Sequence, residues 1–167
     1  MKPQIKLVTI GVYGFDEAGF FSALLKAGVD TFVDIRYRRG MRGSKYAFAN
    51  SAALRRKLNA LGIRYLHVKD LGAPPELRQV QNLADQAEGV LKRERATLSP
   101  AFIRAYEEKV LSRFDPEVFL NQLPPESATL ALFCVEGAPA ACHRSLVAGY
   151  LSKHYGFQVE DIVPWKS

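Results

Sequence analysis

Short apolar runs alternate along this chain with longer segments in which apolar residues recur every three or four positions. Short apolar runs between turn residues are typical of buried strands, whereas the longer period predicts amphipathic helices. Five such runs predict strands at residues 5–10, 31–36, 63–68, 128–133 and 157–163. The run at 128–133 is apolar on both faces, as expected of a strand inside a parallel sheet.

Helical segments fill the intervals between the predicted strands. They lie between residues 14 and 28, 50 and 62, 77 and 91, 99 and 111, 115 and 123, and from about residue 142 onward. Ser99-Pro100 and Asp115-Pro116 each combine a helix-capping residue with a proline that suits the first helical turn. The segment 77–91 carries an apolar stripe, and we expect it to serve mainly as scaffold.

The alternation of strands and helices predicts one domain, residues 1–167, with a three-layer α/β/α fold and a mostly parallel sheet of about five strands. In such sheets the loops at the carboxyl ends of the strands lie along one edge, where ligands bind. Glycine, proline and charged or reactive residues are concentrated in the loops 11–14, 36–46, 69–75 and 136–144. Because all four loops follow strands, the pattern predicts a pocket at the carboxyl edge of the sheet.

The net charge of +6 favours partners that carry negative charge, such as a phosphate-bearing small molecule or a nucleic acid. Two cysteines are too few for a disulfide framework, and the first residues lack the apolar region of a signal peptide. No apolar run is long enough to cross a bilayer, so no membrane partner is expected. We therefore expect a cytoplasmic protein.

The loop 136–144 carries an acid, a thiol, an imidazole and a guanidinium where a strand gives way to a helix. Glu136 is the candidate general acid or base, since a carboxylate at the end of a buried strand becomes more basic. Cys142 is a candidate nucleophile, because a helix N-terminus and the neighbouring His143 lower the pKa of a thiol; the alternative is a small, inert core residue. His143 is a further candidate catalytic residue, and Arg144 is a candidate phosphate ligand.

Asp34 and Arg36 lie two residues apart at a strand end and therefore share one face. Arg36 is a candidate bidentate ligand for a phosphate or a carboxylate. Asp34 would either orient Arg36 or act as a catalytic base. The alternative is a purely structural ion pair.

The loop 36–45 is the most basic stretch of the chain, with four arginines, one lysine and no acid. We expect Arg38 on this loop, and the aromatic residues Tyr13 and Tyr46, to contact the substrate. Basic side chains interleaved with aromatic rings are also typical of surfaces that bind single-stranded nucleic acid. The loop therefore predicts either a pocket rim or a nucleic-acid contact surface.

Two cysteines and a histidine are the candidate metal ligands of this chain. The spacing of Cys134, Cys142 and His143 fits none of the standard zinc patterns. Cys134 also falls inside the apolar strand run, and we expect its side chain to point away from the other two. The sequence therefore predicts no metal and no other cofactor.

Several short sequences of this chain occur together, and in the same order, in one known family. They are Thr9-Ile10-Gly11, Val33-Asp34-Ile35-Arg36, Gly62-Ile63-Arg64-Tyr65, Leu71-Gly72, Cys134-Val135-Glu136, Pro139 and Cys142-His143-Arg144. The chain resembles domain-of-unknown-function family 488 over nearly its whole length. The resemblance implies a three-layer α/β fold and a site at these residues, but no reaction. Many members carry Gly-His-Ser-Asn after the first strand, where this chain has Gly11-Val12-Tyr13-Gly14, so a mechanism that needs that histidine or asparagine does not transfer.

Three functions fit these residues. The first is an enzyme that acts on an anionic, phosphate-bearing substrate, nucleotide or nucleic-acid-related, with Glu136 as acid or base and with Arg36 and Arg144 on the phosphate. The second is a non-catalytic nucleic-acid-binding module that uses the arginine-rich loop. The third is a thiol-dependent enzyme that uses Cys142. Clustered acid, imidazole and thiol groups are unnecessary for phosphate contacts alone, which favours the first function over the second.

Overall fold

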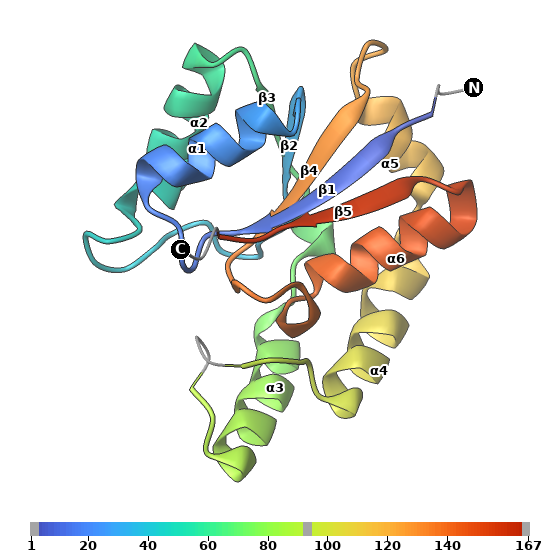
Figure 1. Ribbon diagram of the computed structural model, residues 1–167. Coiled ribbons are helices and arrows are strands. Elements are labelled where there is room, and N and C mark those ends of the chain that lie inside the picture. The colour runs from blue at the N-terminus through green and yellow to red at the C-terminus, as the bar shows by residue number, and fades with distance from the viewer. Residues whose placement is uncertain (1–3, 92–94, 165–167) are drawn as a thin grey trace.

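The computed structural model describes residues 4–91 and 95–164 of the chain. Its centre is a parallel five-stranded sheet with the strand order β3-β2-β4-β1-β5 (Figure 1). The strands are β1 (Lys6–Gly11), β2 (Thr31–Asp34), β3 (Arg64–His67), β4 (Thr129–Cys134) and β5 (Gln158–Ile162). Each strand overlaps the apolar run that predicts it, and the predicted parallel sheet is confirmed.

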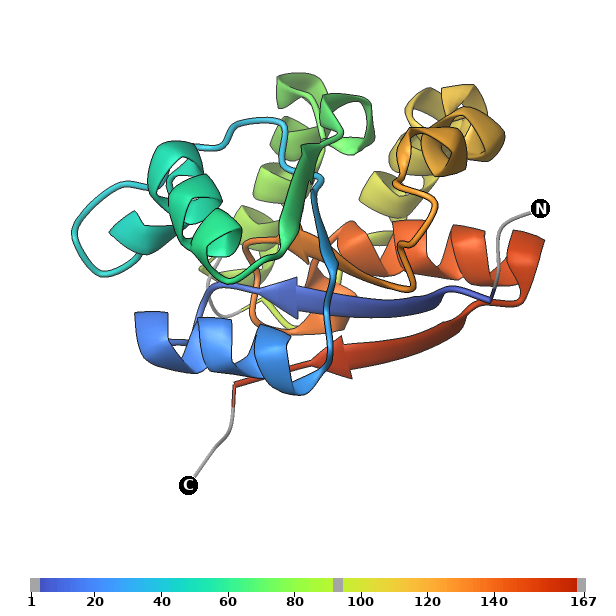
Figure 2. The same ribbon diagram turned by 90° about the horizontal axis from the view of Figure 1, so that it is seen from above.

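Helices cover both faces of the sheet (Figure 1 and Figure 2). On one face, α1 (Glu17–Lys26) and α2 (Ser51–Ala60) pack over a core that includes Phe20, Leu54 and Phe133. The helices of the other face are α3 (Pro75–Glu88), α4 (Pro100–Lys109), α5 (Pro116–Gln122) and α6 (Arg144–Tyr155). This arrangement confirms the predicted three-layer α/β/α fold.

The predicted helix starts at Ser99 and Asp115 are confirmed by side-chain caps. Ser99 Oγ accepts a hydrogen bond from Phe102 N at 3.1 Å, and Asp115 Oδ1 accepts from the backbone of the first turn of α5. In Figure 1, α3 and α4 lie side by side and extend away from the sheet, and the two helices contact each other. Among the residues described, none of the helices combines the length and the apolar character needed to cross a membrane.

The alternation of side chains along the central strand β4 determines the face of the sheet on which Cys134 lies. Its Ala131 and Phe133 pack with α1 and α2, whereas Leu132 and Cys134 belong to the core on the opposite face. Successive side chains of a strand alternate between faces, so Cys134 points toward the layer that contains α6. The loop after β4 then leads to the start of α6 on that same face.

Gly11, at the end of β1, provides the space in which the loop after β4 lies. A Cβ atom at this position would stand only 1.8 Å from the carbonyl oxygen of Glu136 and 2.7 Å from Arg144 Nη1. Any side chain here would displace both groups, so glycine is required by close backbone approach. The close contact with Gly11 thereby fixes the position of the Glu136 backbone relative to the sheet.

Candidate functional site

A pocket of about 480 Å³ lies at the carboxyl edge of the sheet, where the sequence predicts it. Its lining comes from the loops that follow β1, β2, β3 and β4, and also from α3, α4 and the segment between them. The basic residues in this lining, within the described parts of the chain, are Arg36, Arg38, Arg42, Arg78 and Arg95, whereas Glu136 is the acidic one. Arg36 and Arg95 are each paired with a buried carboxylate, so Arg38, Arg42 and Arg78 supply the positive charge of the lining that these carboxylates do not neutralise.

Asp34 forms a buried ion pair with Arg36. Its carboxylate accepts hydrogen bonds from Arg36 Nε at 2.9 Å, from Arg36 Nη2 at 2.8 Å and from the Tyr65 hydroxyl at 2.6 Å. Asp34 is fully buried and is not part of the pocket lining. The geometry therefore favours the structural ion pair for Asp34 and gives no support to its catalytic role.

Arg36 belongs to the lining of the pocket, although its side chain is almost fully buried. The side chain is 3% exposed, and Nη1 is buried without a hydrogen-bond partner among the described residues. The group lies over the ring of Phe133, with Cζ 4.8 Å from the ring centroid. Asp34 binds Nε and Nη2, so Nη1 is the guanidinium nitrogen that has no partner among the described residues.

Burial, reinforced by the negative charge of Asp34, raises the pKa of Tyr65 to about 12. The Tyr65 hydroxyl therefore stays protonated and remains a donor to Asp34 over the whole neutral range. This hydroxyl also accepts a long hydrogen bond from Arg39 Nη1 at 3.4 Å. Tyr65 thus links the arginine-rich loop to the buried ion pair.

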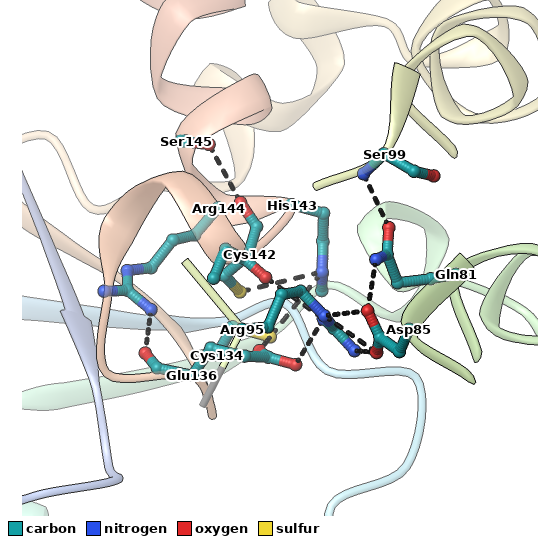
Figure 3. A network of polar contacts seen from close by, with 11 residues as sticks. Gln81, Asp85, Arg95, Ser99, Cys134, Glu136, Cys142, His143, Arg144 and Ser145 are labelled. Carbon is teal, nitrogen blue, oxygen red and sulfur yellow. Dashed lines mark hydrogen bonds and ion pairs between the residues drawn. The ribbon is translucent and has the colours of Figure 1, made fainter. Parts of the chain in front are cut away.

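Two thiols, an imidazole and a carboxylate meet at the end of β4 (Figure 3). Cys134 Sγ lies 3.6 Å from His143 Nδ1 and 3.6 Å from Glu136 Oε2, and Cys142 Sγ lies 3.9 Å from the same nitrogen. The prediction that Cys134 points away from Cys142 is wrong, because the last residue of β4 faces the layer in which α6 begins. Cys134 Sγ, Cys142 Sγ and one His143 nitrogen all lie within 4.8 Å of one another.

The environment of Cys142 differs from the one predicted for a nucleophile. The residue is 1% exposed, and burial, with the neighbouring Cys134 and Glu136, raises the pKa of its thiol well above the usual value. His143 does lower this pKa, as predicted, but burial outweighs it, so the predicted net lowering of the thiol pKa is wrong. Cys142 precedes the first residue of α6 by two positions, and desolvation outweighs the nearby positive charge.

Arg144 lies behind the loop and not in the pocket. It is fully buried, and its guanidinium donates hydrogen bonds to the carbonyl oxygens of Glu136 at 2.5 Å and Gly137 at 3.3 Å. These bonds hold the loop after β4 in place (Figure 3). The predicted phosphate contact of Arg144 has no support in this geometry, and the residue is better described as a positioning residue.

The other predicted residues do converge. Tyr13, Tyr46 and Arg38 line the pocket together with Arg36, Glu136, Cys142 and His143. The rings of Tyr13 and Tyr46 are 5.3 Å apart, and Tyr46 accepts a hydrogen bond from Gly14 N at 3.2 Å. Seven of the nine predicted site residues therefore share one cavity, and Asp34 and Arg144 stand behind its wall.

Sequence reasoning missed the wall formed by α3 and the residues that follow it. Arg95 forms an ion pair with Asp85 at 2.7 Å, approaches Glu136 Oε1 at 3.4 Å and donates to Ala141 O at 3.2 Å (Figure 3). Gln81 joins this network by donating to Asp85 Oδ1 at 2.8 Å and by accepting from Ser99 N at 2.9 Å. The segment predicted as scaffold thus supplies site residues.

A signal for this wall was present in the sequence. Arg78, Gln81, Asn82 and Asp85 follow one another at helical spacing and form a polar stripe beside the buried Leu77. Two of the stripe's members, Gln81 and Asp85, are buried. Buried polar residues require partners, so such a stripe indicates a polar site against the helix.

The family model described as "Domain of unknown function DUF488" matches residues 18–151. The chain belongs to the DUF488 family. The resemblance noted in the sequence is thereby confirmed, and the matched span contains every lining residue of the pocket except Tyr13. A search of curated proteins and a search of solved structures found no match to this DUF488 chain.

Proposed function

We propose that this protein is an enzyme that binds an anionic, phosphate-bearing substrate, nucleotide or nucleic-acid-related, in the pocket at the carboxyl edge of the sheet. The observation that carries the proposal is Arg36 Nη1, a buried donor on the pocket wall without a partner among the described residues. Leaving such a donor unpaired costs about 1–3 kcal/mol, and more when the group is charged. A phosphate oxygen at this position would remove that cost.

The remaining lining supports the same class of ligand. Arg38, Arg42 and Arg78 add positive charge around the opening, and Tyr13 and Tyr46 add aromatic rings. Arginine forks recognise phosphate oxygens, and aromatic rings stack on nucleobases. The combination suits a phosphate that carries a flat organic group.

Glu136 is the group that favours an enzyme over a simple binding protein. Its carboxylate lines the pocket, with Oε1 near Arg95 Nη1 and Oε2 near Cys134 Sγ. Arg95 and the Arg144-held backbone fix its position, as a general acid or base requires. The burial and raised pKa of Cys142 count against a mechanism in which a free Cys142 thiolate attacks the substrate.

The test is calorimetric titration of the full chain with nucleoside monophosphates, nucleoside diphosphates and inorganic phosphate. We expect Arg36→Lys, which keeps the charge but removes Nη1, to weaken binding of the best ligand about tenfold, or about 1.4 kcal/mol. We expect Arg42→Ala to weaken it less, because Arg42 is exposed. The matched control is Arg113→Ala, which removes an exposed charge outside the pocket and should leave binding unchanged.

Two results would count against the proposal. One is the absence of heat or thermal stabilisation with every phosphate-bearing ligand. The other is equal binding by wild type and Arg36→Lys. If a ligand binds, its conversion by the wild-type enzyme is measured. Glu136→Gln serves as the inactive reference, since that variant keeps the shape of the side chain.

A nucleic-acid-binding role is the second candidate, and one observation favours it. Arg38, Arg42 and Lys45 are exposed on the loop that rims the pocket. Lys69 stands over the ring of Tyr37 at 4.7 Å, which continues the basic and aromatic surface. Such a rim suits the backbone of a strand whose end enters the pocket.

A further inference from the structure

We propose that Cys134, Cys142 and His143 are the protein ligands of a zinc ion whose fourth position faces the pocket. A metal site here goes beyond the proposed function and does not depend on it, because it rests on the cluster at the end of β4 and not on the arginines. Three features of the cluster support it: the separations of the ligand atoms, the orientation of the imidazole and the balance of charge.

The separations are those of atoms that share one tetrahedral ion. Zinc binds cysteine sulfur at about 2.3 Å and histidine nitrogen at about 2.0–2.1 Å, so a tetrahedral angle places S and N about 3.5 Å apart. Cys134 Sγ and Cys142 Sγ lie 3.6 Å and 3.9 Å from His143 Nδ1. All three ligand atoms lie within 4.8 Å of one another, and two sulfur atoms on one tetrahedral zinc ion lie about 3.8 Å apart, so shifts of at most about 1 Å would bring them to ligand distance.

The imidazole is held in the orientation that a metal ligand needs. His143 Nε2 lies 3.0 Å from the carbonyl oxygen of Ile35, and a carbonyl only accepts, so Nε2 carries the proton. In the neutral ring, which a metal ligand requires, Nδ1 then directs its lone pair at the two sulfur atoms. Histidine ligands of metals commonly donate their second ring nitrogen to a backbone carbonyl in this way.

The backbone fixes the carbonyl that orients His143. Ile35 donates its own N–H to Phe133 O at 3.1 Å, which ties the end of β2 to β4. The imidazole orientation is thus determined by the sheet and not by a mobile side chain.

The charges of the cluster balance for a divalent ion. Two thiolates and a neutral imidazole neutralise Zn²⁺, and soft sulfur ligands with one imidazole are typical of zinc sites. Glu136, which lines the pocket, lies beside the cluster, with Oε2 at 3.6 Å from Cys134 Sγ. Three protein ligands with a fourth position open to a pocket form the arrangement of catalytic zinc.

A zinc ion at this position would act as a Lewis acid beside the arginines and would lower the pKa of a bound water. Arg36 would hold an anion next to it, and Glu136 would exchange a proton with that water. The residues of the chain are thus arranged for metal-assisted chemistry on a substrate bound in the pocket.

The experiment is metal analysis and cobalt substitution of the full chain under reducing conditions. We expect about one equivalent of zinc after loading and dialysis. Cobalt loading should give a near-ultraviolet sulfur-to-cobalt charge-transfer band and intense visible bands of tetrahedral cobalt. These readouts need no substrate, so they are independent of whether the pocket binds phosphate.

Cys134→Ser, Cys142→Ser and His143→Gln should each abolish the charge-transfer spectrum or weaken metal binding at least tenfold. The matched control is His154→Gln, which changes an exposed histidine of α6 and should leave the spectrum unchanged. Circular dichroism establishes whether each variant is folded, and wild-type cobalt binding decides the question without any variant.

Three results would overturn the proposal. The first is reduced, folded wild type that takes up neither zinc nor cobalt at micromolar concentration. The second is a metal that is retained equally by the cysteine variants. The third is a native Cys134–Cys142 disulfide, detected as the loss of two hydrogens in the intact mass of protein purified without reductant.

Discussion

The buried pair of Asp34 and Arg36 lets one substitution separate a structural role from a catalytic one. Asp34→Asn keeps the size of the side chain but removes its charge and places an amide against donors. The side chains of Asp34 and Arg36 are 0% and 3% exposed, so solvent cannot replace the missing interaction. Breaking a buried ion pair on one side costs about 3–5 kcal/mol, a large part of the stability of a typical domain.

The matched control is the surface pair of Arg64 and Glu126. Its charged atoms are 2.9 Å apart, almost as in the buried pair, but the two side chains are 63% and 65% exposed. Glu126→Gln should therefore lower the free energy of unfolding by less than about 1 kcal/mol. The assay is urea unfolding followed by circular dichroism, with both variants compared with wild type at one pH and salt concentration.

A double variant tests the cause. Asp34→Asn combined with Arg36→Met should destabilise the fold by about 1–3 kcal/mol less than the sum of the two single changes, because the second change removes the uncompensated charge. If Asp34→Asn costs no more than Glu126→Gln, the ion pair is not a structural element and the assignment of Asp34 is wrong.

Three further predictions concern the loop, the tyrosine and the basic rim. Gly11→Ala should lower the thermal midpoint and weaken ligand binding, because its Cβ would stand 1.8 Å from a backbone oxygen of the loop after β4; an unchanged midpoint contradicts this. Because the pKa of Tyr65 is raised to about 12, its protonated hydroxyl should stabilise the fold fully below pH 10.0, and this stabilisation should disappear as the pH rises toward 12. Ultraviolet titration of wild type and Tyr65→Phe measures the pKa of this hydroxyl. Ionisation of Tyr65 at the ordinary tyrosine pKa of 10.0 would contradict the prediction. If the rim binds nucleic acid, changing Arg38, Arg39 and Arg42 to Ala should reduce the salt dependence of oligonucleotide binding by roughly one unit for each phosphate that the variant no longer neutralises; equal slopes for both proteins contradict that role.

The fold and the position of the pocket follow from local pattern. The apolar run of β4 identifies a strand inside the sheet, because a strand covered by helices on both sides is apolar on both faces. The pocket position then follows from the rule that loops at the carboxyl ends of parallel strands gather at one edge. Neither inference needs knowledge of which distant residues touch.

The details of the site depend on long-range contacts and were missed for that reason. Periodicity shows that α3 buries a stripe, but not that its Asp85 meets Arg95 beside Glu136. An arginine near a helix start suggests phosphate binding, yet Arg144 turns inward toward carbonyl groups that lie in the space left by Gly11. Spacing along the chain likewise says little about whether Cys134 and Cys142 face each other.

Arg36 meets any incoming anion with its conformation already fixed. Freezing a flexible arginine side chain costs about 1.5–2 kcal/mol of conformational entropy, and here the Asp34 carboxylate has imposed that order during folding. A ligand that reaches Nη1 therefore gains the hydrogen bond without this cost, but only if its acceptor matches the one direction in which the N–H points. If the pocket binds an anion as we propose, preorganisation of this kind would make it selective for the geometry of the anion as well as for its charge.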